Sequence, residues 1–447
     1  MSKTLHDNEL KTCRTGGVDP DDQKLSAAVP IVTLPVPKSV KIPVLQHLGA
    51  PAKAVVQRGD KVKVGQVIAR HEGAFSANIH ASVSGTIGQI KEEMDSSGFK
   101  HLAVHIRTEE DEWMETIDRS ETHIEKITLS REDIITRIED SGIVGMGGAA
   151  FPSHAKVVLP EGKHIDTLLI NGVECEPYLT SDHRLMLEKP KEVITGVRIL
   201  MKELGVERAV IGIEDNKHDA VTLLSGLLRD DPTIEVQPLA VQYPQGGERQ
   251  LIQAVLGREV PSRGLPYDVG VIVHNVGTTF AVYEAVQKNK PLIERIVTVT
   301  GKNVSKPSNF RARIGTPVME LIAAAGGLPE GTGKVVAGGP MMGRAIGDLE
   351  SPVWKGMSGI LLIPEAEAKR AQEYRCVRCG KCVEVCPMGL EPYLLMTLAK
   401  SGDIKQADHE HVIDCIECGS CSFVCPANRP ILDYIRLGKT KAKSRKS

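Results

Sequence analysis

Two short runs of cysteine constrain the fold of this chain more than any other feature. Eight of its ten cysteines lie between residues 376 and 425, and only Cys13 and Cys175 stand outside that interval. A secreted disulfide framework distributes its cysteines through a small chain, whereas these are crowded at one end of 447 residues. The distribution therefore predicts a metal-binding module attached to a larger body.

Both runs have the form C-x2-C-x2-C-x3-C-P, and each ends in Cys386-Pro387 or Cys425-Pro426. This is the spacing of bacterial ferredoxins, in which three thiolates of one run bind one [4Fe–4S] cluster and the fourth binds the cluster of the other run. Two sets of ligands are therefore expected. The cluster 1 set is Cys376, Cys379, Cys382 and Cys425, and the cluster 2 set is Cys415, Cys418, Cys421 and Cys386.

Structural zinc is the alternative for these cysteines. Zinc sites favour C-x2-C pairs rather than two four-cysteine runs that each end in Cys-Pro. The spacing therefore favours iron–sulfur clusters, set in a helical frame because the stretch PYLLMTLAK between the runs has a helical pattern. Cys13 and Cys175 are expected to take no part in cluster binding.

The overall composition narrows the function classes. A formal net charge of −2 and an isoelectric point near 6.7 give no general attraction to nucleic acid or anionic lipid. Aromatic residues make up 3% of the chain, which disfavours base-stacking platforms. No apolar run reaches the ~18 residues of a membrane helix, and the N-terminus MSKTLHDNEL lacks the apolar core of a secretion signal. We therefore expect a soluble intracellular protein that binds no nucleic acid.

The N-terminal quarter of the chain is expected to be an extended segment followed by a β domain. Residues 1–30 are polar and turn-rich. Residues 31–112 contain short alternating strands broken by turns, in an order that resembles the barrel-sandwich fold of lipoyl domains. Those domains carry their cofactor on a lysine at a hairpin tip. The matching tip is Ala74–Phe75, and residues 72–90 contain no lysine, so the resemblance implies the fold without a swinging arm.

The rest of the chain predicts three further domains. Helices and strands alternate over residues 125–292, which is typical of a mainly parallel, Rossmann-like sheet, with Ser130 capping the first helix. Residues 293–363 resemble a soluble-ligand-binding β-grasp domain. A helical double [4Fe–4S] ferredoxin domain over 366–436 and a disordered basic tail over 437–447 follow. The expected fold class is thus multidomain, with α/β, β and α parts.

A glycine-rich stretch, SGIVGMGGAAFPSHAK, spans residues 141–156. Gly145, Gly147 and Ala150 satisfy the relaxed dinucleotide fingerprint G-x-G-x-x-A. That fingerprint needs a strand before it and a helix after it, whereas here a helical pattern precedes the loop and Phe-Pro follows at once. Taken alone, the motif leaves a simple tight turn as an equal alternative.

Polar motifs follow three of the predicted strands. NGVECEP follows HIDTLLI, GGER follows LAVQYP, and HNVGT ends VGVIV. Because the carboxyl ends of parallel strands lie at one edge of a sheet, these motifs are expected to form a single ligand-binding crevice.

The order GxGGAAFPxxxK, NGVECEP, GGERQLI, VPSRGLP and HNVGT resembles the flavin- and NADH-binding subunit of respiratory complex I and its relatives. The similarity is strongest to the C subunits of Rnf complexes, the ferredoxin–NAD oxidoreductases of bacterial membranes. It covers nearly the whole chain, including a GG-x-x-P-x-x-x-K segment at residues 16–24. The resemblance implies a complex I type flavin domain that binds FMN, with NAD(H) as the substrate.

The resemblance also implies which residues contact these molecules. Those expected around FMN are Gly145, Gly147, Gly148, Lys156 beside the phosphate, Asn171, Glu174, Asn275 and Thr278. Those expected near the nicotinamide are Glu248, the stacking Phe151 and the hydrogen-bonding Glu176. The chain departs from the complex I pattern at Val173 and Arg249, where that pattern has acids, and from the Rnf pattern at Asp19, where His is usual.

The implied function is electron transfer between NAD(H) and the two clusters, because a flavin converts two-electron hydride transfer into single-electron steps. No side chain is expected to act as a catalytic acid or base. The resemblance places the chain on the cytoplasmic side of the bacterial membrane as a peripheral subunit. Other subunits would deliver ferredoxin-derived electrons and couple the reaction to Na⁺ or H⁺ translocation.

Two other functions stay open on the sequence. Soluble NADH-dependent cobalamin reductases share the flavin and cluster parts, although that branch starts at the flavin domain and has no match to residues 1–110. A ferredoxin-like docking subunit without a bound nucleotide would also keep the cysteine runs.

Overall fold

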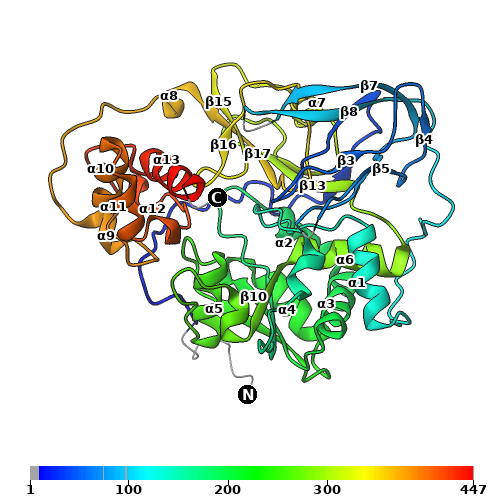
Figure 1. Cartoon of the computed structure of the whole chain (residues 1–447), viewed down its shortest axis with the longest axis horizontal. Coiled ribbons are helices and arrows are strands. Elements are labelled where there is room, and N and C mark those ends of the chain that lie inside the picture. Colours follow the sequence, from blue (N-terminus) through cyan, green and yellow to red (C-terminus); the bar gives the residue numbers. More distant parts are fainter. Residues whose placement is uncertain (1–9, 74, 96–97, 446–447) are drawn as a thin grey trace.

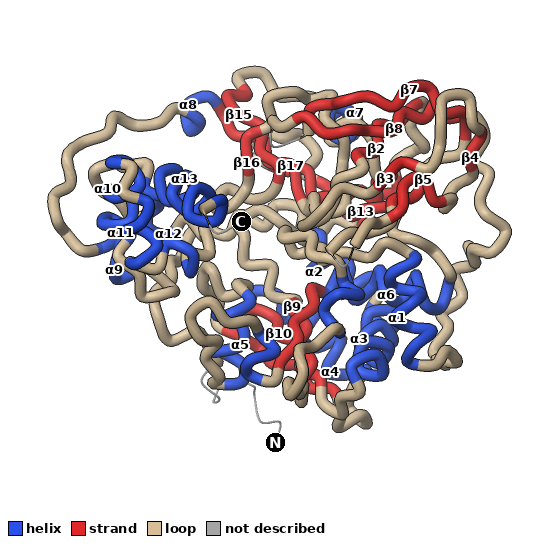
Figure 2. Tube along the Cα trace, in the orientation of Figure 1, coloured by secondary structure: helices blue, strands red, loops and turns tan. Residues whose placement is uncertain are grey.

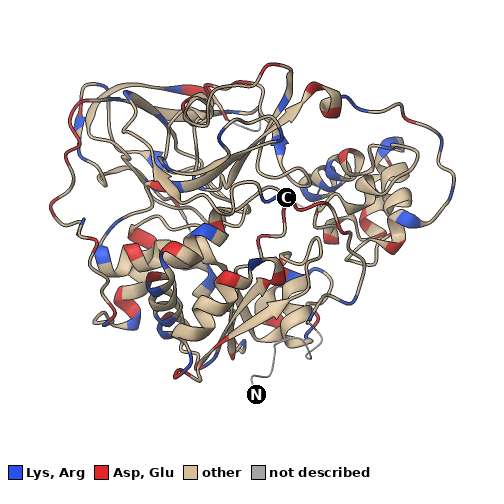
Figure 3. Ribbon diagram, turned by 180° about the vertical axis from the view of Figure 1, so that it is seen from behind, with Lys and Arg blue, Asp and Glu red and all other residues tan. Residues whose placement is uncertain are grey.

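The structure, a computed structural model, describes residues 10–73, 75–95 and 98–445, so Ala74 of the predicted hairpin tip and the ends of the chain lie outside it. Helices dominate the α/β part and the cysteine module, and strands dominate the other two parts (Figures 1 and 2). Charged residues of both signs are interspersed over the ribbon (Figure 3). Within the described ranges, no helix has both the length and the apolar character needed to cross a bilayer.

The α/β part is built on a four-stranded sheet in which every neighbouring pair is parallel. In sheet order, the strands are β11 (Ile234–Leu239), β10 (Ala209–Glu214), β9 (Thr167–Asn171) and β12 (Val271–Asn275). The helices of this part are α1 (Arg131–Asp140), α2 (Ser181–Glu188), α3 (Pro190–Leu204), α4 (His218–Leu227), α5 (Glu248–Leu256) and α6 (Val276–Lys288). The predicted parallel sheet is confirmed.

Capping residues set the start of two helices that flank this sheet. Ser130 accepts a hydrogen bond from the Asp133 amide in a capping box, so α1 begins where the sequence predicts. The sequence interpretation ended β12 in a turn and missed α6. Asn275 caps that helix by accepting from the amides of Gly277 and Thr278. Nearly all of α6 is buried, so it lacks the polar face that reveals an amphipathic helix.

The barrel-sandwich part consists of two small antiparallel sheets. One contains, in order, β2 (Ser39–Pro43), β8 (Lys100–Thr108), β7 (Gly85–Met94) and β4 (Lys61–Val62). The other contains β3 (Lys53–Ala54), β5 (Val67–Arg70) and β6 (Ile79–His80). The short strands and turns of the sequence thus form the two-layered sheet structure that their order predicts.

The β-grasp part contains a six-stranded sheet. In order, its strands are β1 (Ile31–Thr33), β14 (Ser308–Arg313), β13 (Glu294–Thr300), β17 (Gly359–Pro364), β15 (Thr332–Ala337) and β16 (Arg344–Ala345), with α7 (Val318–Ala324) packed against it. The assignment of residues 31–33 to the barrel-sandwich part is wrong, because β1 pairs in parallel with β14. A partner so distant in sequence leaves no signal in the local pattern.

The cysteine module follows α8 (Glu365–Ala368) and a long connecting loop (Figure 1). Its helices are α9 (Lys381–Glu384), α10 (Pro392–Ser401), α11 (Ile404–His409), α12 (Ser420–Phe423) and α13 (Ile431–Ser444). The prediction of a disordered tail is wrong as far as Ser444. Gly438 and Ala442 are buried on α13, and lysines suit the negative end of a helix dipole.

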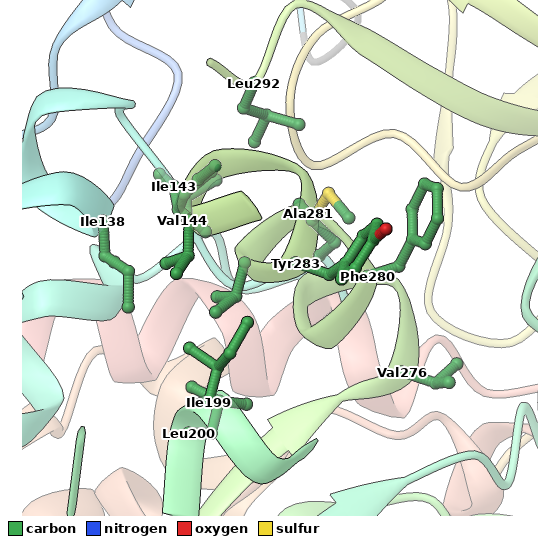
Figure 4. Packing of buried hydrophobic residues seen from close by; sticks show 14 of the residues in the cluster. Ile138, Ile143, Val144, Ile199, Leu200, Val276, Phe280, Ala281, Tyr283 and Leu292 are labelled. Carbon is green, nitrogen blue, oxygen red and sulfur yellow. The ribbon is translucent and has the colours of Figure 1, made fainter. Parts of the chain in front are cut away.

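Part of the largest apolar core lies between α1, α3 and α6, where apolar side chains pack together (Figure 4). Helices α3 and α6 approach so closely that Gly196 of α3 faces the Thr279 backbone. A Cβ at Gly196 would overlap the Thr279 carbonyl oxygen.

We therefore predict that Gly196→Ala lowers the free energy of unfolding by ~1–3 kcal/mol, because the added methyl group forces the helices apart. Gly226→Ala in α4 is the matched control, since its Cβ would meet nothing within 4 Å. That control should raise stability by up to ~1 kcal/mol through helix propensity. Urea unfolding followed by circular dichroism measures both. Equal effects would contradict the close approach of α3 and α6.

Candidate functional site

The residues predicted to form a crevice lie at the carboxyl edge of the parallel sheet. Asn171 ends β9, Asn275 ends β12, and the two residues are partners in the strand register. The Asn171 side chain donates a hydrogen bond to the Gly246 carbonyl (2.8 Å), which joins the loop before α5 to the same edge. The three polar motifs that the sequence places after strands therefore meet, as predicted.

The glycine loop, residues 141–152, is fastened to this edge. The Met146 amide donates to the buried Thr278 hydroxyl oxygen at 2.8 Å. A Cβ at Gly147 would lie 3.4 Å from the Cβ of Asn275, which is tight for a side chain. Glycine at this position therefore allows the loop backbone to approach the end of β12.

The glycine loop closes on itself and leaves one side open. The Gly145 amide donates to the Phe151 carbonyl (2.8 Å), and the Ala150 amide donates to that of Gly145 (3.1 Å). Gly148 has a φ of +111°, and a Cβ there would meet no atom within 4 Å. The loop thus presents backbone next to free space, which is the condition for close approach of a phosphate or a flat ring.

Lys156 provides a positive charge beneath this loop. Its Nζ donates to the Val273 carbonyl (2.5 Å) and lies 3.8 Å from a carboxylate oxygen of Glu248. Burial lowers the pKa of Lys156, and the Glu248 charge opposes that effect. The neighbouring His274 is buried, and neither of its ring nitrogens has a partner among the described residues. Burial and the Lys156 charge hold the His274 pKa well below its ordinary value, so the ring is neutral.

Glu174 and Asn275 are held by hydrogen bonds within the protein. The Glu174 carboxylate accepts from the amides of Asp182 (2.8 Å) and His183 (3.1 Å), at the positive end of α2. The Asn275 side chain donates to the Asp182 carboxylate at 2.6 Å. Burial, with a contribution from Glu174, raises the pKa of Asp182. These hydrogen bonds fix the orientation of the Glu174 and Asn275 side chains. The roles of both residues toward a flavin stay predictions.

Glu176 points toward the β-grasp part. Its two carboxylate oxygens accept from the amides of Met341 (3.1 Å) and Met342 (2.7 Å). Burial raises the pKa of Glu176 to about 7, although both amide hydrogen bonds favour the charged form. In this arrangement Glu176 joins two domains at the rim of the crevice, and its predicted contact with NADH is untested.

Phe151 meets an aromatic ring from another domain. Its ring centroid lies 5.7 Å from that of Phe75, with the planes tilted by 55°. Phe75 occupies the position of the lipoyl-bearing tip, and the Leu48 amide beside it donates to the Ala150 carbonyl at 3.0 Å. Sequence reasoning missed this contact, because nothing local indicates that the tip reaches the glycine loop.

The cluster 2 set surrounds one cavity. Cys386, Cys415, Cys418 and Cys421 line it, together with apolar residues such as Leu395. Burial is the main cause that raises the pKa of Cys415 to about 12, and the nearby Cys418 and Cys386 add to it. Four soft thiol donors around an apolar cavity fit a [4Fe–4S] cluster.

The cluster 1 set is more open. Cys376 and Cys379 are exposed, whereas Cys382 and Cys425 are partly buried. Burial raises the pKa of Cys382, and Cys425 and Cys376 lie near enough to add to that shift. The fourth cysteine of the second run thus approaches the first run, as the ferredoxin pattern requires.

The sequence interpretation assigned no role to two cations near these residues, the partly buried Lys24 and the buried Arg295. Lys24 donates to the carbonyls of Glu174, Glu176 and Leu179. Arg295 of β13 donates to the Met146 carbonyl of the glycine loop (3.4 Å) from behind. The GG-x-x-P-x-x-x-K pattern marked Lys24 as notable, but no pattern pointed to Arg295.

The fold and these sites define a flavin and iron–sulfur electron-transfer protein. Residues 138–284 match the Nuo51 FMN-binding domain family, and residues 375–429 match the 4Fe-4S dicluster domain family. Residues 13–111 match the RnfC barrel sandwich hybrid domain, and residues 296–345 match the SLBB domain.

Relatives along the whole chain identify the family. The chain is 46% identical to the C subunit of the proton-translocating ferredoxin:NAD(+) oxidoreductase complex of Clostridium ljungdahlii, over 96% of this chain and 93% of that protein. It is 42% identical to the C subunit of the Na(+)-translocating complex of Acetobacterium woodii, over 95% and 96%. It is 41% identical to the C subunit of the ion-translocating oxidoreductase complex of Rhodobacter capsulatus, over 97% and 83%. The chain belongs to the family of Rnf complex C subunits.

A solved structure shares the fold. An NAD+-reducing [NiFe]-hydrogenase in the H2-reduced state aligns with a TM-score of 0.50 at 18% identity, over 70% of this chain and 63% of that one. The similarity extends beyond any single domain of the chain.

Thr278→Val should loosen the glycine loop, because it leaves the buried Met146 amide without its acceptor at a cost of ~1–3 kcal/mol. Thr279→Val is the matched control, since the Thr279 hydroxyl only donates to the Asn275 carbonyl. Titration of the apoprotein with FMN, followed by flavin fluorescence, should show weaker binding in Thr278→Val alone. If the two variants bind FMN with equal affinity, the Met146–Thr278 hydrogen bond does not contribute to cofactor binding.

Glu176 should make stability depend on pH. Its folded pKa of about 7 exceeds the ordinary 4.5, so the folded chain binds the proton more tightly. The stabilisation is present below pH 4.5 and is lost as pH rises through about 7. Glu176→Gln should flatten this fall, whereas Glu235→Gln, at an exposed position of β11, should not. Denaturant unfolding at a series of pH values measures it, and parallel curves for the natural chain and Glu176→Gln would contradict it.

Proposed function

We propose that this chain transfers electrons between NAD(H) and two [4Fe–4S] clusters through FMN, as the C subunit of an ion-translocating ferredoxin:NAD(+) oxidoreductase complex. The observation that carries the proposal is the meeting of Asn171, Asn275 and the glycine loop within the segment that matches the FMN-binding family. When bound, FMN supplies the exchange of hydride with nicotinamide and of single electrons with iron–sulfur clusters.

The crevice residues bind and orient in this proposal. The glycine loop offers backbone amides, and Lys156 offers a partly buried counter-charge for the phosphate. Phe151 provides a flat apolar face for the nicotinamide. The residues that we assign to FMN are Gly145, Gly147, Gly148, Lys156, Asn171, Glu174, Asn275 and Thr278, and those assigned to NAD(H) are Phe151, Glu176 and Glu248. We assign no side chain a proton-transfer role, because FMN, when bound, would supply the hydride chemistry.

We place the chain at the cytoplasmic face of the bacterial membrane as a peripheral subunit. NADH is a cytoplasmic substrate, and the relatives are named as subunits of ion-translocating complexes. Partner subunits would hold the chain there, exchange ferredoxin-derived electrons with it and couple the reaction to Na⁺ or H⁺ translocation.

The two alternatives receive less support. The branch of soluble cobalamin reductases starts at the flavin domain. It therefore does not account for the N-terminal part, which matches the RnfC barrel sandwich domain over residues 13–111. A docking subunit without a nucleotide does not account for the match to an FMN-binding domain over residues 138–284.

The direct test is anaerobic reconstitution with FMN, iron and sulfide, followed by addition of NADH. The visible flavin absorbance should bleach, and the clusters should then become reduced. If the chain retains no flavin and NADH leaves the clusters oxidised, the proposal fails. Rapid reduction of an added corrinoid would instead support the cobalamin reductase.

Lys156→Met should weaken FMN binding by roughly ten- to a hundredfold, because a hydrogen bond to a charged group contributes ~1.5–3 kcal/mol. Lys163→Met is the control, since Lys163 pairs with Asp268 at a partly exposed position. Equilibrium titration of the apoprotein with FMN compares the two. If the two variants bind FMN with equal affinity, Lys156 does not contact the FMN phosphate.

A further inference from the structure

The NGVECEP loop, residues 171–177, has an unusual backbone conformation at the carboxyl edge of the parallel sheet. Glu174 in this loop has a φ of +48°, in the left-handed region that residues other than glycine rarely adopt. Such a conformation persists only where surrounding contacts hold it, and it is common at binding sites. The contacts that hold this backbone therefore indicate what the loop conformation does.

Lys24 of the N-terminal segment holds three carbonyl groups of this loop and its continuation. Its ammonium donates to the carbonyls of Glu174 (2.8 Å), Glu176 (3.0 Å) and Leu179 (2.9 Å). An ammonium has three donor hydrogens, so these contacts use all of them. The Glu174 carbonyl is therefore turned toward Lys24.

Lys217 holds a fourth carbonyl group from the neighbouring strand of the sheet. It follows β10, which pairs with β9, and its ammonium donates to the Val173 carbonyl at 2.7 Å. The same ammonium donates to the Asn216 side chain (2.8 Å) and lies 3.4 Å from a carboxylate oxygen of Glu214. Lys217 is buried, and an ammonium is tolerated there because these groups replace its water. Since Glu214 balances its charge, Lys217 acts on the loop by orienting it.

The two lysines turn a pair of backbone amides in the opposite direction. In a trans peptide, the N–H group points opposite to the carbonyl of the preceding residue. The amide of Glu174 therefore points away from Lys217, and the amide of Cys175 points away from Lys24. Neither amide has a hydrogen-bond acceptor among the residues that the structure describes. These two adjacent groups, the loop amides, can therefore bind an oxygen atom or a negative charge on a ligand.

We propose that Lys24 and Lys217 are positioning residues: they present the loop amides to FMN, so that the chain binds reduced FMN more tightly than oxidised FMN. The proposal rests on the function proposed above. Hydride transfer from NADH brings two electrons and one proton, so the flavin gains one negative charge. Amide dipoles that are already oriented stabilise such a charge without reorganisation. The two lysines thereby raise the midpoint potential of the bound flavin.

Removal of each ammonium from the full reconstituted chain tests the proposal. Lys24→Met and Lys217→Met should each lower the ratio of the affinities for reduced and oxidised FMN by roughly ten- to a hundredfold, because hydrogen bonds to a charged group are weakened. Spectroelectrochemical titration at the flavin absorbance measures this ratio as a shift of the flavin midpoint potential to a lower value. Failure of the unsubstituted chain to bind FMN would instead overturn the proposed function.

Lys288→Met is the matched control for a loss of structure alone. Lys288 is also buried, but its ammonium donates to Asp118 (2.7 Å) and Ser120 (3.0 Å). Its removal should lower the free energy of unfolding and leave the flavin potential unchanged. Lys24 is partly buried and lies outside the α/β part, so Lys24→Met tests the proposal even if Lys217→Met does not fold. An unchanged flavin potential in Lys24→Met would overturn the proposal.

Hydrogen exchange resolved to single residues by mass spectrometry reports on the loop amides directly. Addition of FMN to the unsubstituted chain should slow exchange at both Glu174 and Cys175. In Lys24→Met this protection should fall at Cys175, and in Lys217→Met it should fall at Glu174, because each lysine orients a different peptide group. Equal protection of both amides in all three chains would overturn the positioning role of the lysines.

Discussion

The crevice depends on the parallel pairing of β9 with β12. That pairing brings Asn171 and Asn275 into register although they are far apart in the chain. It also fixes the start of α6, because Asn275 caps that helix and Thr278 in its first turn accepts from the glycine loop. A parallel sheet collects its carboxyl ends at one edge. The glycine loop therefore needs no strand directly before it. Although its sequence does not fit the Rossmann fingerprint, the loop is held at the sheet edge by residues that follow β12.

Lysines from three parts of the chain lie around this edge, of which Lys355 is buried and Lys24 and Lys156 are partly buried. Lys24, Lys156 and Lys355 each donate to backbone carbonyls, and Lys355 joins Asn78 of the barrel-sandwich part to Gly142 of the glycine loop. Burial lowers the pKa of Lys355 to about 7, which expresses the cost of placing an ammonium in the interior. Such a group is tolerated only where hydrogen bonds replace its water. Lys24 and Lys355 therefore each favour one arrangement of neighbouring parts, because a small displacement would leave the ammonium unsatisfied, whereas Lys156 acts within the α/β part.

The sequence predicted those features of the fold that depend on residues close together in the chain. The cysteine spacing grouped Cys386 with the second run, whose cysteines line one cavity with it, Ser130 marked the start of α1, and the alternation of strands and helices gave the parallel sheet. The misses have a common cause in tertiary structure. Helix α6 is buried on nearly all sides, β1 pairs with a strand far along the chain, and the basic end of α13 is held by packing of Gly438 and Ala442. The acids Glu174 and Glu176 were placed at the crevice, but their partners come from α2 and the β-grasp part.

The barrel-sandwich part shows how a fold can keep its geometry and change what it presents. In lipoyl domains a tip lysine must reach through solvent, so the tip has to be free. Here Phe75 stands at that position and packs against Phe151, and the Leu48 amide bonds to Ala150 of the same loop. Phe75 at this position is thus in contact with the flavin domain rather than free in solvent. The part of the barrel-sandwich domain that resembles a cofactor-bearing tip instead packs beside the glycine loop, through Phe75 and through the Leu48 amide.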